Sequence, residues 1–121
     1  MEVNNIFAIE PNSARRKLAK EMLNIDSIES WDNSLENSFD ISIDAVGQDS
    51  QPEVLTNCLK SAKLNSKVLI FGIPTMYKQD LSIYLLLRKN LTIIGSINPD
   101  WSVYLPKGVK LAYENIELKH L

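Results

Sequence analysis

The chain has 121 residues, of which 45% are hydrophobic and 23% charged, values that fit one packed domain and exclude a disordered chain. Thirteen Lys and Arg residues against 15 Asp and Glu residues leave a formal charge of −2, which argues against a dedicated nucleic-acid-binding protein. The single cysteine, Cys58, excludes an internal disulfide and a multi-cysteine zinc site. Apolar runs stay at five residues or fewer, too short for a membrane span, and no leader pattern opens the chain. We expect a soluble, cytoplasmic α/β domain.

A strand and a helix are predicted first. Residues 3–9 are rich in side chains that favour strands, and a Glu-Pro-Asn sequence then signals a turn. Apolar residues recur at helical spacing over residues 14–23. The side chain of Asn12 or Ser13 can cap this helix by accepting its orphan backbone N–H groups.

The middle of the chain contains the clearest helix signal. A short strand is predicted at residues 27–29 and a firm one at residues 39–46. The helix that follows has Ser50 and Glu53 at capping-box spacing and Pro52 in its first turn. Its apolar stripe consists of Val54, Leu55, Cys58, Leu59 and Ala62.

The same alternation continues to the end of the chain. Residues 67–71 and 91–97 predict buried strands, and Asp80 can cap a helix over residues 81–89. A last helix is predicted over residues 106–115, with a proline at its start. Uniformly apolar strands that alternate with helices are typical of a doubly wound parallel sheet with helices on both faces, and this α/β class is the predicted fold.

The carboxyl ends of the predicted strands are the candidate ligand site, because parallel α/β sheets bind ligands there. Three of these ends have a glycine at or beside them, namely Gly47, Gly72 and Gly95. A missing Cβ lets a flat ligand approach the backbone, but taken alone the glycines are better explained as makers of tight strand-to-helix turns. Glu10 ends the first strand, where an acid can accept both hydroxyls of an adenosine ribose and repel a 2′-phosphate. The alternative is a solvent-exposed glutamate.

Other charged residues permit two interpretations each. Arg15, Arg16 and Lys17 can lie over a ribose or an adenine, or form a solvated helix face, which is the favoured interpretation. Asp40 and Asp44 share one face of a strand and are conceivable as an acid/base pair. Asp44 can instead end a hydrogen-bond network near the cofactor loop.

Four segments, IFAIEPNSARRKLAKEM, FDISIDAVGQ, KVLIFGIPT and LTIIGSI, follow one another in this order. They resemble the coenzyme domain of the medium-chain dehydrogenase/reductase family, the zinc-type alcohol and polyol dehydrogenases, from its second Rossmann strand onward. The resemblance covers essentially all 121 residues. It implies the coenzyme-binding portion of an NAD-dependent alcohol or polyol dehydrogenase, whose intact form transfers a hydride.

The resemblance also implies cofactor-binding positions. Glu10 corresponds to the acid that binds the adenosine ribose, which implies NAD rather than NADP, and Arg15 corresponds to its basic neighbour. The other implied positions line the adenine and ribose pocket or flank the nicotinamide half: Ala45, Val46, Gly72, Ile73, Gly95, Ser96 and Ile97. No catalytic residue or metal ligand is assigned. Cys58 is predicted to be a core residue and His120 a surface residue.

Two parts of the family pattern are missing. The sequence contains no Gly-x-Gly-x-x-Gly turn, whose backbone N–H groups hold the pyrophosphate, and no catalytic domain with zinc ligands. We therefore interpret residues 1–121 as a partial NAD(P)-binding Rossmann-like domain, incomplete at its N-terminal unit. We expect weak or absent NAD binding and no catalysis by this chain alone, with zinc confined to the missing domain.

The missing strand is central in the family's strand order, so its neighbours are expected to have open edges. This suggests an alternative function, a non-catalytic association module that forms a homo-oligomer or pairs with a complementing N-terminal half. A third interpretation is a stand-alone α/β binding domain whose sheet closes without the missing strand. No membrane or nucleic-acid partner is expected.

Overall fold

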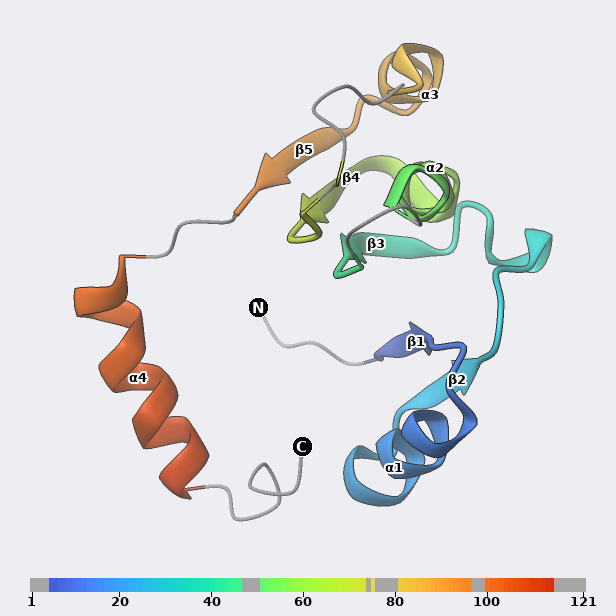
Figure 1. Ribbon diagram of the computed structural model, residues 1–121. Coiled ribbons are helices and arrows are strands. Elements are labelled where there is room, and N and C mark those ends of the chain that lie inside the picture. Colours follow the sequence, from blue (N-terminus) through green and yellow to red (C-terminus); the bar gives the residue numbers. More distant parts are fainter. Residues whose placement is uncertain (1–4, 47–50, 74, 76–80, 97–99, 115–121) are drawn as a thin grey trace. The chain divides into compact units, whose positions relative to one another are not determined.

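Strands and helices alternate along the computed structural model, which describes residues 5–46, 51–73, 75, 81–96 and 100–114 (Figure 1). Every strand pairing among these residues is parallel, which confirms the predicted α/β fold class. The strands form a two-stranded sheet of order β1-β2 and a three-stranded sheet of order β3-β4-β5. By internal contacts the chain divides into unit 1 (Met1–Trp31 with Asp100–Leu121) and unit 2 (Asp32–Pro99), and each is described separately.

In unit 1, β1 (Phe7–Ile9) pairs in parallel with β2 (Asp26–Ile28), and α1 (Ser13–Leu23) connects them. Of the two predicted caps, Asn12 is the one used: its side chain accepts the first free backbone N–H groups of α1. Asn24 closes the helix in the left-handed conformation, with φ 52°. No residue of these three elements is fully buried.

Unit 2 contains β3 (Phe39–Asp44), α2 (Gln51–Ser61), β4 (Ala62–Ile70), α3 (Ile83–Lys89) and β5 (Thr92–Gly95). Helices α2 and α3 contact each other and both contact β4. They therefore cover the same face of the three-stranded sheet, as two successive right-handed crossovers in one direction require.

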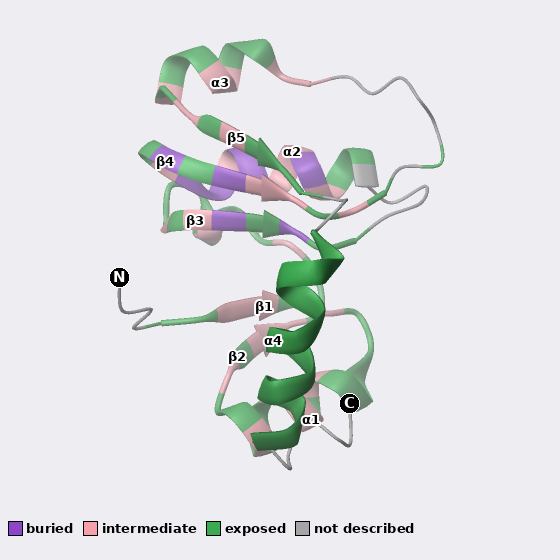
Figure 2. Ribbon diagram, turned by 90° about the vertical axis from the view of Figure 1, so that its left-hand side faces the viewer, coloured by how far each residue is buried: buried purple, intermediate pink, exposed green. Residues whose placement is uncertain are grey.

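The hydrophobic core lies between these helices and the sheet. Its buried members are Leu55, Cys58, Leu59, Ala62 and Val68, four of which match the apolar stripe predicted for α2. Figure 2 shows the buried residues gathered on α2, β3 and β4. Burying such side chains contributes about 1.5–3 kcal/mol each relative to exposure, so this cluster supplies the main stabilisation of the unit.

Lys89, the last residue of α3, closes the end of α2. Its Nζ donates to three backbone carbonyls, those of Leu59 at 2.9 Å, Lys60 at 2.5 Å and Ala62 at 2.9 Å. Burial lowers the pKa of Lys89, while the negative charge of Glu36 acts in the opposite direction. An ammonium group here satisfies carbonyls that a helix end leaves without partners.

The strand boundaries differ from the prediction for local reasons. The regular ladder of β4 starts at Lys67, as predicted, but the strand extends back to Ala62 across a register shift. Strand β3 ends at Asp44 instead of residue 46, because the Asp44 side chain turns the chain by accepting the Val46 N–H. The short 3-10 helix η1 (Asn33–Leu35) was not predicted.

The starts of the last two helices also differ. Helix α3 is capped by Ser82, whose Oγ accepts the Leu85 N–H at 3.4 Å, whereas Asp80 lies outside the described residues. The predicted start of the last helix at Pro106 is wrong, since α4 (Trp101–Glu114) begins after Asp100 and contains that proline.

The position of Asp100 explains this start of α4. Its carboxylate accepts the Ser102 N–H at 3.0 Å and the Ser102 hydroxyl at 2.5 Å, and these hydrogen bonds lower the pKa of Asp100. Its carbonyl accepts the Tyr104 N–H at 2.9 Å. None of the helices in the described ranges combines the length and the hydropathy needed to cross a membrane.

Asparagine takes the left-handed backbone positions of the described chain. Four residues other than glycine have positive φ, and all are asparagines: Asn24 at 52°, Asn37 at 54°, Asn65 at 61° and Asn90 at 50°. Two of them, Asn24 and Asn90, cap helices. The Asn90 side chain also donates to Asn65 Oδ1 at 2.7 Å. Asparagine tolerates this conformation better than most side chains.

Candidate functional site

The turn after β1 holds the carboxylate of Glu10 in a defined place. The Glu10 N–H donates to the Ile28 carbonyl at 3.0 Å and so continues the β1–β2 ladder. Its Oε1 accepts the Asn12 N–H at 2.9 Å, and its Oε2 lies 3.5 Å from Arg15 Nη1. The Glu10 side chain is 29% exposed and that of Arg15 is 72% exposed. Glu10 is thus half-buried, and the alternative of a freely solvated glutamate is wrong.

Arg16 does not lie on a solvated helix face. Its Nη1 donates to the carbonyls of Glu10 at 2.7 Å and Pro11 at 2.8 Å, and its Nη2 lies 3.4 Å from Glu29 Oε2. Only 21% of the Arg16 side chain is exposed. Lys17, which pairs with Glu21 at 3.7 Å on the surface, does fit the solvated interpretation.

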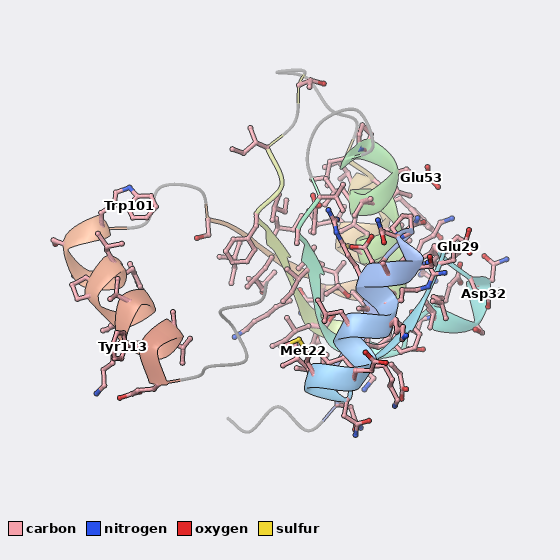
Figure 3. All side chains as sticks on the ribbon, turned by 60° about the horizontal axis from the view of Figure 1, so that its bottom comes forward. Met22, Glu29, Asp32, Glu53, Trp101 and Tyr113 are labelled. Carbon is pink, nitrogen blue, oxygen red and sulfur yellow. The ribbon has the colours of Figure 1, made fainter. Side chains whose placement is uncertain are left out.

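A shallow cavity of about 230 Å³ lies against α1 and the two strands of this unit. Its wall is mainly apolar, with Leu18, Ala19 and Met22 contributed by α1, and the two charged residues on it are Glu10 and Arg15. Figure 3 labels Met22, which belongs to the cavity wall on α1, and Glu29, which follows β2. Sites for drug-sized ligands usually have about 300–1,000 Å³, so this cavity is smaller than such a site.

In unit 2, the carboxyl ends of β3 and β4 are joined through Asp44. Its side chain is fully buried, Oδ1 accepts the Val46 N–H at 3.0 Å, and its carbonyl accepts the N–H groups of Phe71 at 2.8 Å and Gly72 at 3.1 Å. Asp44 thus takes part in the hydrogen bonds at this strand end, while the coenzyme role of the loop stays a prediction. Ala45 and Val46 follow it as exposed residues.

Gly72 is required here by a close approach of two backbone segments. A Cβ on Gly72 would overlap the Val46 carbonyl oxygen and lie 2.9 Å from Asp44 Oδ1. Gly95, in contrast, has nothing within 4 Å of a Cβ position. None of the three described glycines, Gly72, Gly95 and Gly108, has a positive φ. The close approach of the Val46 carbonyl makes Gly72 a structural requirement of this strand end.

The third strand end completes the edge. The Ser96 N–H donates to the Ile70 carbonyl at 3.0 Å, which places the end of β5 beside that of β4. Ile73 is 59% exposed beyond β4. The parallel register thus brings Val46, Gly72 and Ser96 to one edge of the sheet, as predicted. Gly47 and Ile97 lie outside the described residues.

Other candidate chemistry finds no support in unit 2. Asp40 is exposed and pairs with Lys63 Nζ at 2.9 Å, while Asp44 is buried, so the two do not form an acid/base pair. Burial, with a smaller contribution from Asp44, raises the pKa of the Cys58 thiol to about 12. The thiol therefore stays protonated, in agreement with its predicted core role.

The described residues do not supply the several neighbouring ligands that a metal site needs. They contain no group of three or more His, Cys, Asp and Glu side chains that could hold a metal ion. His120, predicted to be a surface residue, lies outside the ranges that the structure describes.

Comparison with known proteins identifies relatives. A family model described as zinc-binding dehydrogenase matches residues 1–113. Among solved structures, TarJ of S. aureus in complex with NADPH is similar with a TM-score of 0.77 and 16% identity, over 95% of this chain and 35% of that chain. Benzyl alcohol dehydrogenase of Acinetobacter calcoaceticus is similar with a TM-score of 0.74 and 17% identity, over 96% of this chain and 34% of that one.

A third solved structure, 2R,3R-butanediol dehydrogenase of Bacillus subtilis, has a TM-score of 0.72 and 20% identity, over 92% of this chain and 33% of that one. At these identities the similarity shows the fold. The chain spans about a third of the length of the solved structures that it matches. No curated protein matches it.

Proposed function

Because the chain belongs to the zinc-binding dehydrogenase family, we propose that it is the nucleotide-coenzyme-binding portion of an NAD-dependent alcohol or polyol dehydrogenase. In this proposal residues 1–121 form a partial Rossmann-like domain in the cytoplasm, and the intact enzyme transfers a hydride between substrate and nicotinamide. The observation that carries the proposal is the half-buried carboxylate of Glu10 at the carboxyl end of parallel strand β1.

The surroundings of Glu10 fit the adenosine ribose of NAD. One carboxylate oxygen is oriented by the Asn12 N–H at 2.9 Å, and the other lies 3.5 Å from a guanidinium that is mostly exposed. An anchored carboxylate can accept two hydroxyl groups, and its charge disfavours the 2′-phosphate of NADP. The apolar cavity wall beside it, with Leu18 and Met22, suits the base of the nucleoside.

The strand edge of unit 2 supports the same proposal by itself. Gly95, which has open space at its Cβ position, and the exposed Val46 and Ile73 leave a surface of backbone and apolar side chains that a flat ring can approach. We assign Ala45, Val46, Gly72, Ile73, Gly95, Ser96 and Ile97 to coenzyme contact on this basis and on the family resemblance. Bound NAD supplies the hydride acceptor. These residues would orient it and exclude water.

Zinc does not fit the described residues, because they offer no cluster of suitable ligands and the one cysteine is buried and protonated. The family resemblance assigns zinc ligands to a separate catalytic domain. No step of the proposed function is therefore routed through zinc in this chain, and the chain alone is expected not to catalyse hydride transfer.

The test is a titration of the isotope-labelled chain with NAD⁺, followed by amide chemical shifts, which detect weak binding. We expect shifts at Glu10, Asn12 and Arg15, with a dissociation constant weaker than about 1 mM. Glu10→Gln should weaken binding, whereas Glu21→Gln, an exposed change on the neighbouring helix α1, should not. Micromolar binding by calorimetry would contradict the expected weakness, and no shifts near Glu10 would contradict the coenzyme role.

A second candidate function is association with another polypeptide, either a second copy or a complementing N-terminal half. Among the described strands, β3 and β5 each pair with β4 alone and β1 pairs only with β2. Open edges of this kind are places where further strands add. Light scattering at micromolar concentration should give a dimer mass, and a clean monomer would count against self-association.

A further inference from the structure

We propose that Arg16 is a positioning residue that fixes the turn carrying the Glu10 carboxylate and thereby sets the preference between the two nicotinamide coenzymes. This inference rests on the proposed coenzyme role of Glu10. It concerns a residue that does not touch the coenzyme in the proposal, because its guanidinium is turned toward the backbone of the turn.

Every polar group of Glu10 has a partner. Its N–H donates to the Ile28 carbonyl, and its two carboxylate oxygens contact the Asn12 N–H and the Arg15 guanidinium. Its carbonyl accepts from Arg16 Nη1 at 2.7 Å. Of these contacts, those at the N–H and the carbonyl decide the backbone direction, and therefore where the carboxylate points.

The Arg16 guanidinium donates hydrogen bonds to two consecutive peptide units, through the Glu10 and Pro11 carbonyls. The same Nη1 that reaches the Glu10 carbonyl also reaches the Pro11 carbonyl at 2.8 Å, and Nη2 lies 3.4 Å from Glu29 Oε2 at the end of β2. Hydrogen bonds from a charged donor are stronger than those between neutral groups. One side chain of α1 thus joins the turn to the end of the neighbouring strand.

This contact lies where none of the described residues of unit 1 (5–31 and 100–114) is buried, so packing does not hold the turn. The α1–β1–β2 elements are half-buried or exposed throughout. The Arg16 side chain, with 21% exposed, is the less exposed partner of its ion pair. A guanidinium presents several donors in a fixed plane, which a lysine ammonium does not, so the geometry depends on arginine.

Loss of the Arg16 guanidinium should therefore let the turn relax and the Glu10 carboxylate move. The carboxylate would then discriminate less between a ribose 2′-hydroxyl and a 2′-phosphate, while the exposed Arg15 beside it would still attract a phosphate. Binding of NAD⁺ should weaken and binding of NADP⁺ should not, so the ratio of the two affinities is the informative quantity.

The experiment compares wild type with Arg16→Met, Arg16→Lys and a matched control, Lys20→Met. Lys20 also joins α1 to β2, through Asp26 Oδ1 at 2.8 Å, but away from the turn. Each labelled variant is titrated with NAD⁺ and with NADP⁺. In addition, hydrogen exchange of the Asn12 amide, which donates to Glu10 Oε1, is measured without coenzyme.

We expect wild type and Lys20→Met to prefer NAD⁺ by about tenfold, Arg16→Met by less than about threefold, and Arg16→Lys to lie between them. Exchange of the Asn12 amide should accelerate in Arg16→Met alone. If Arg16→Met keeps both the wild-type ratio and the wild-type exchange rate, the inference is overturned.

The two proposals can fail separately. If wild type binds neither coenzyme, the proposed function fails, and the Asn12 amide still reports on the turn: faster exchange in Arg16→Met supports its positioning role, and unchanged exchange overturns it. If Arg16→Met does not fold, Arg16→Lys against Lys20→Met gives the same comparison, and equal ratios in the two overturn the inference.

Discussion

The β1–α1–β2 region (residues 5–31) and unit 2 are built from the same alternation of strand and helix, yet different forces hold them together. In unit 2, five apolar side chains are buried between two helices and the sheet. In the β1–α1–β2 region no residue is fully buried, and polar contacts made by Asn12, Arg16 and Lys20 connect the helix to the turn and to β2.

The difference shows that the contacts that orient a side chain and the contacts that stabilise the fold can lie in separate regions. The carboxylate of Glu10 depends on oriented hydrogen bonds, which fix direction but add little net stability each. The core of unit 2 contributes much of the stability but fixes the strand edge only through a few contacts, such as those of Asp44 and Gly72. Perturbations should therefore affect the two regions in different ways.

The largest expected effect is from truncation of the core. Leu59→Ala removes a side chain that is 1% exposed and should destabilise unit 2 by about 2–5 kcal/mol. Leu87→Ala is the matched control, since Leu87 is also helical but 73% exposed, and should change stability by less than about 0.5 kcal/mol. Urea unfolding followed by amide signals of β4 measures both, and equal losses would refute the assignment of the core.

The next effect is at the strand edge. Gly72→Ala forces a methyl group against the Val46 carbonyl and should cost about 1–3 kcal/mol. Gly95→Ala adds the same atom in open space and should be nearly neutral. The two unfolding midpoints give the comparison directly. A neutral Gly72→Ala would mean that the two backbone segments can separate freely.

A smaller effect is expected from alkaline pH. The folded-state pKa of Cys58 is raised to about 12, above its ordinary value of 9.0, so the folded state keeps a proton that the unfolded chain releases. This contribution is complete below pH 9 and is lost as the pH rises toward 12. The loss amounts to about 1 kcal/mol at pH 10. Cys58→Ala should flatten the dependence of stability on pH above 9, and an unchanged slope would contradict the assignment.

The smallest effect is expected from added salt, which should act on the β1–α1–β2 region and not on unit 2. Both side chains of the Lys20–Asp26 pair are exposed. Adding 1 M salt reduces the Debye length to about 3 Å and therefore weakens this ion pair. Exchange of the Glu10 amide, which donates to the Ile28 carbonyl, should accelerate about twofold. The Phe71 amide of unit 2, bonded to the Asp44 carbonyl, should not respond. Equal responses would remove the distinction between the two regions.

The sequence predicted the elements and the parallel pairing because apolar periodicity reflects burial. The stripe predicted for α2 contains four of the five core residues, although one of them, Ala62, is the first residue of β4. The Asn12 cap was one of two predicted. The start of α4 was missed because Pro106 is a good first-turn residue and so concealed the capping of Asp100. The early part of β4 was missed because Asn65 interrupts its apolar pattern.

The candidate site was predictable only in part. Strand ends mark where ligands bind in any parallel sheet, so the edge with Val46, Gly72 and Ser96 followed from the pattern. The direction of a side chain does not follow from such a pattern. Arg15 and Arg16 are adjacent and chemically equal, yet one lies at the Glu10 carboxylate and the other at its carbonyl. Helical rotation of about 100° per residue separates them, which only the three-dimensional turn reveals.

The use of asparagine at left-handed turns has a consequence for protein engineering. An L-residue in this conformation is strained by about 1–2 kcal/mol relative to glycine, although asparagine is strained less than most. Asn24 and Asn37 are the natural sites for glycine, whereas Asn65 and Asn90 hydrogen-bond each other and would lose that contact. Because Asn24 and Asn37 belong to different units, gains at the two should add. The chain therefore retains room for thermal improvement at positions other than the proposed coenzyme residues.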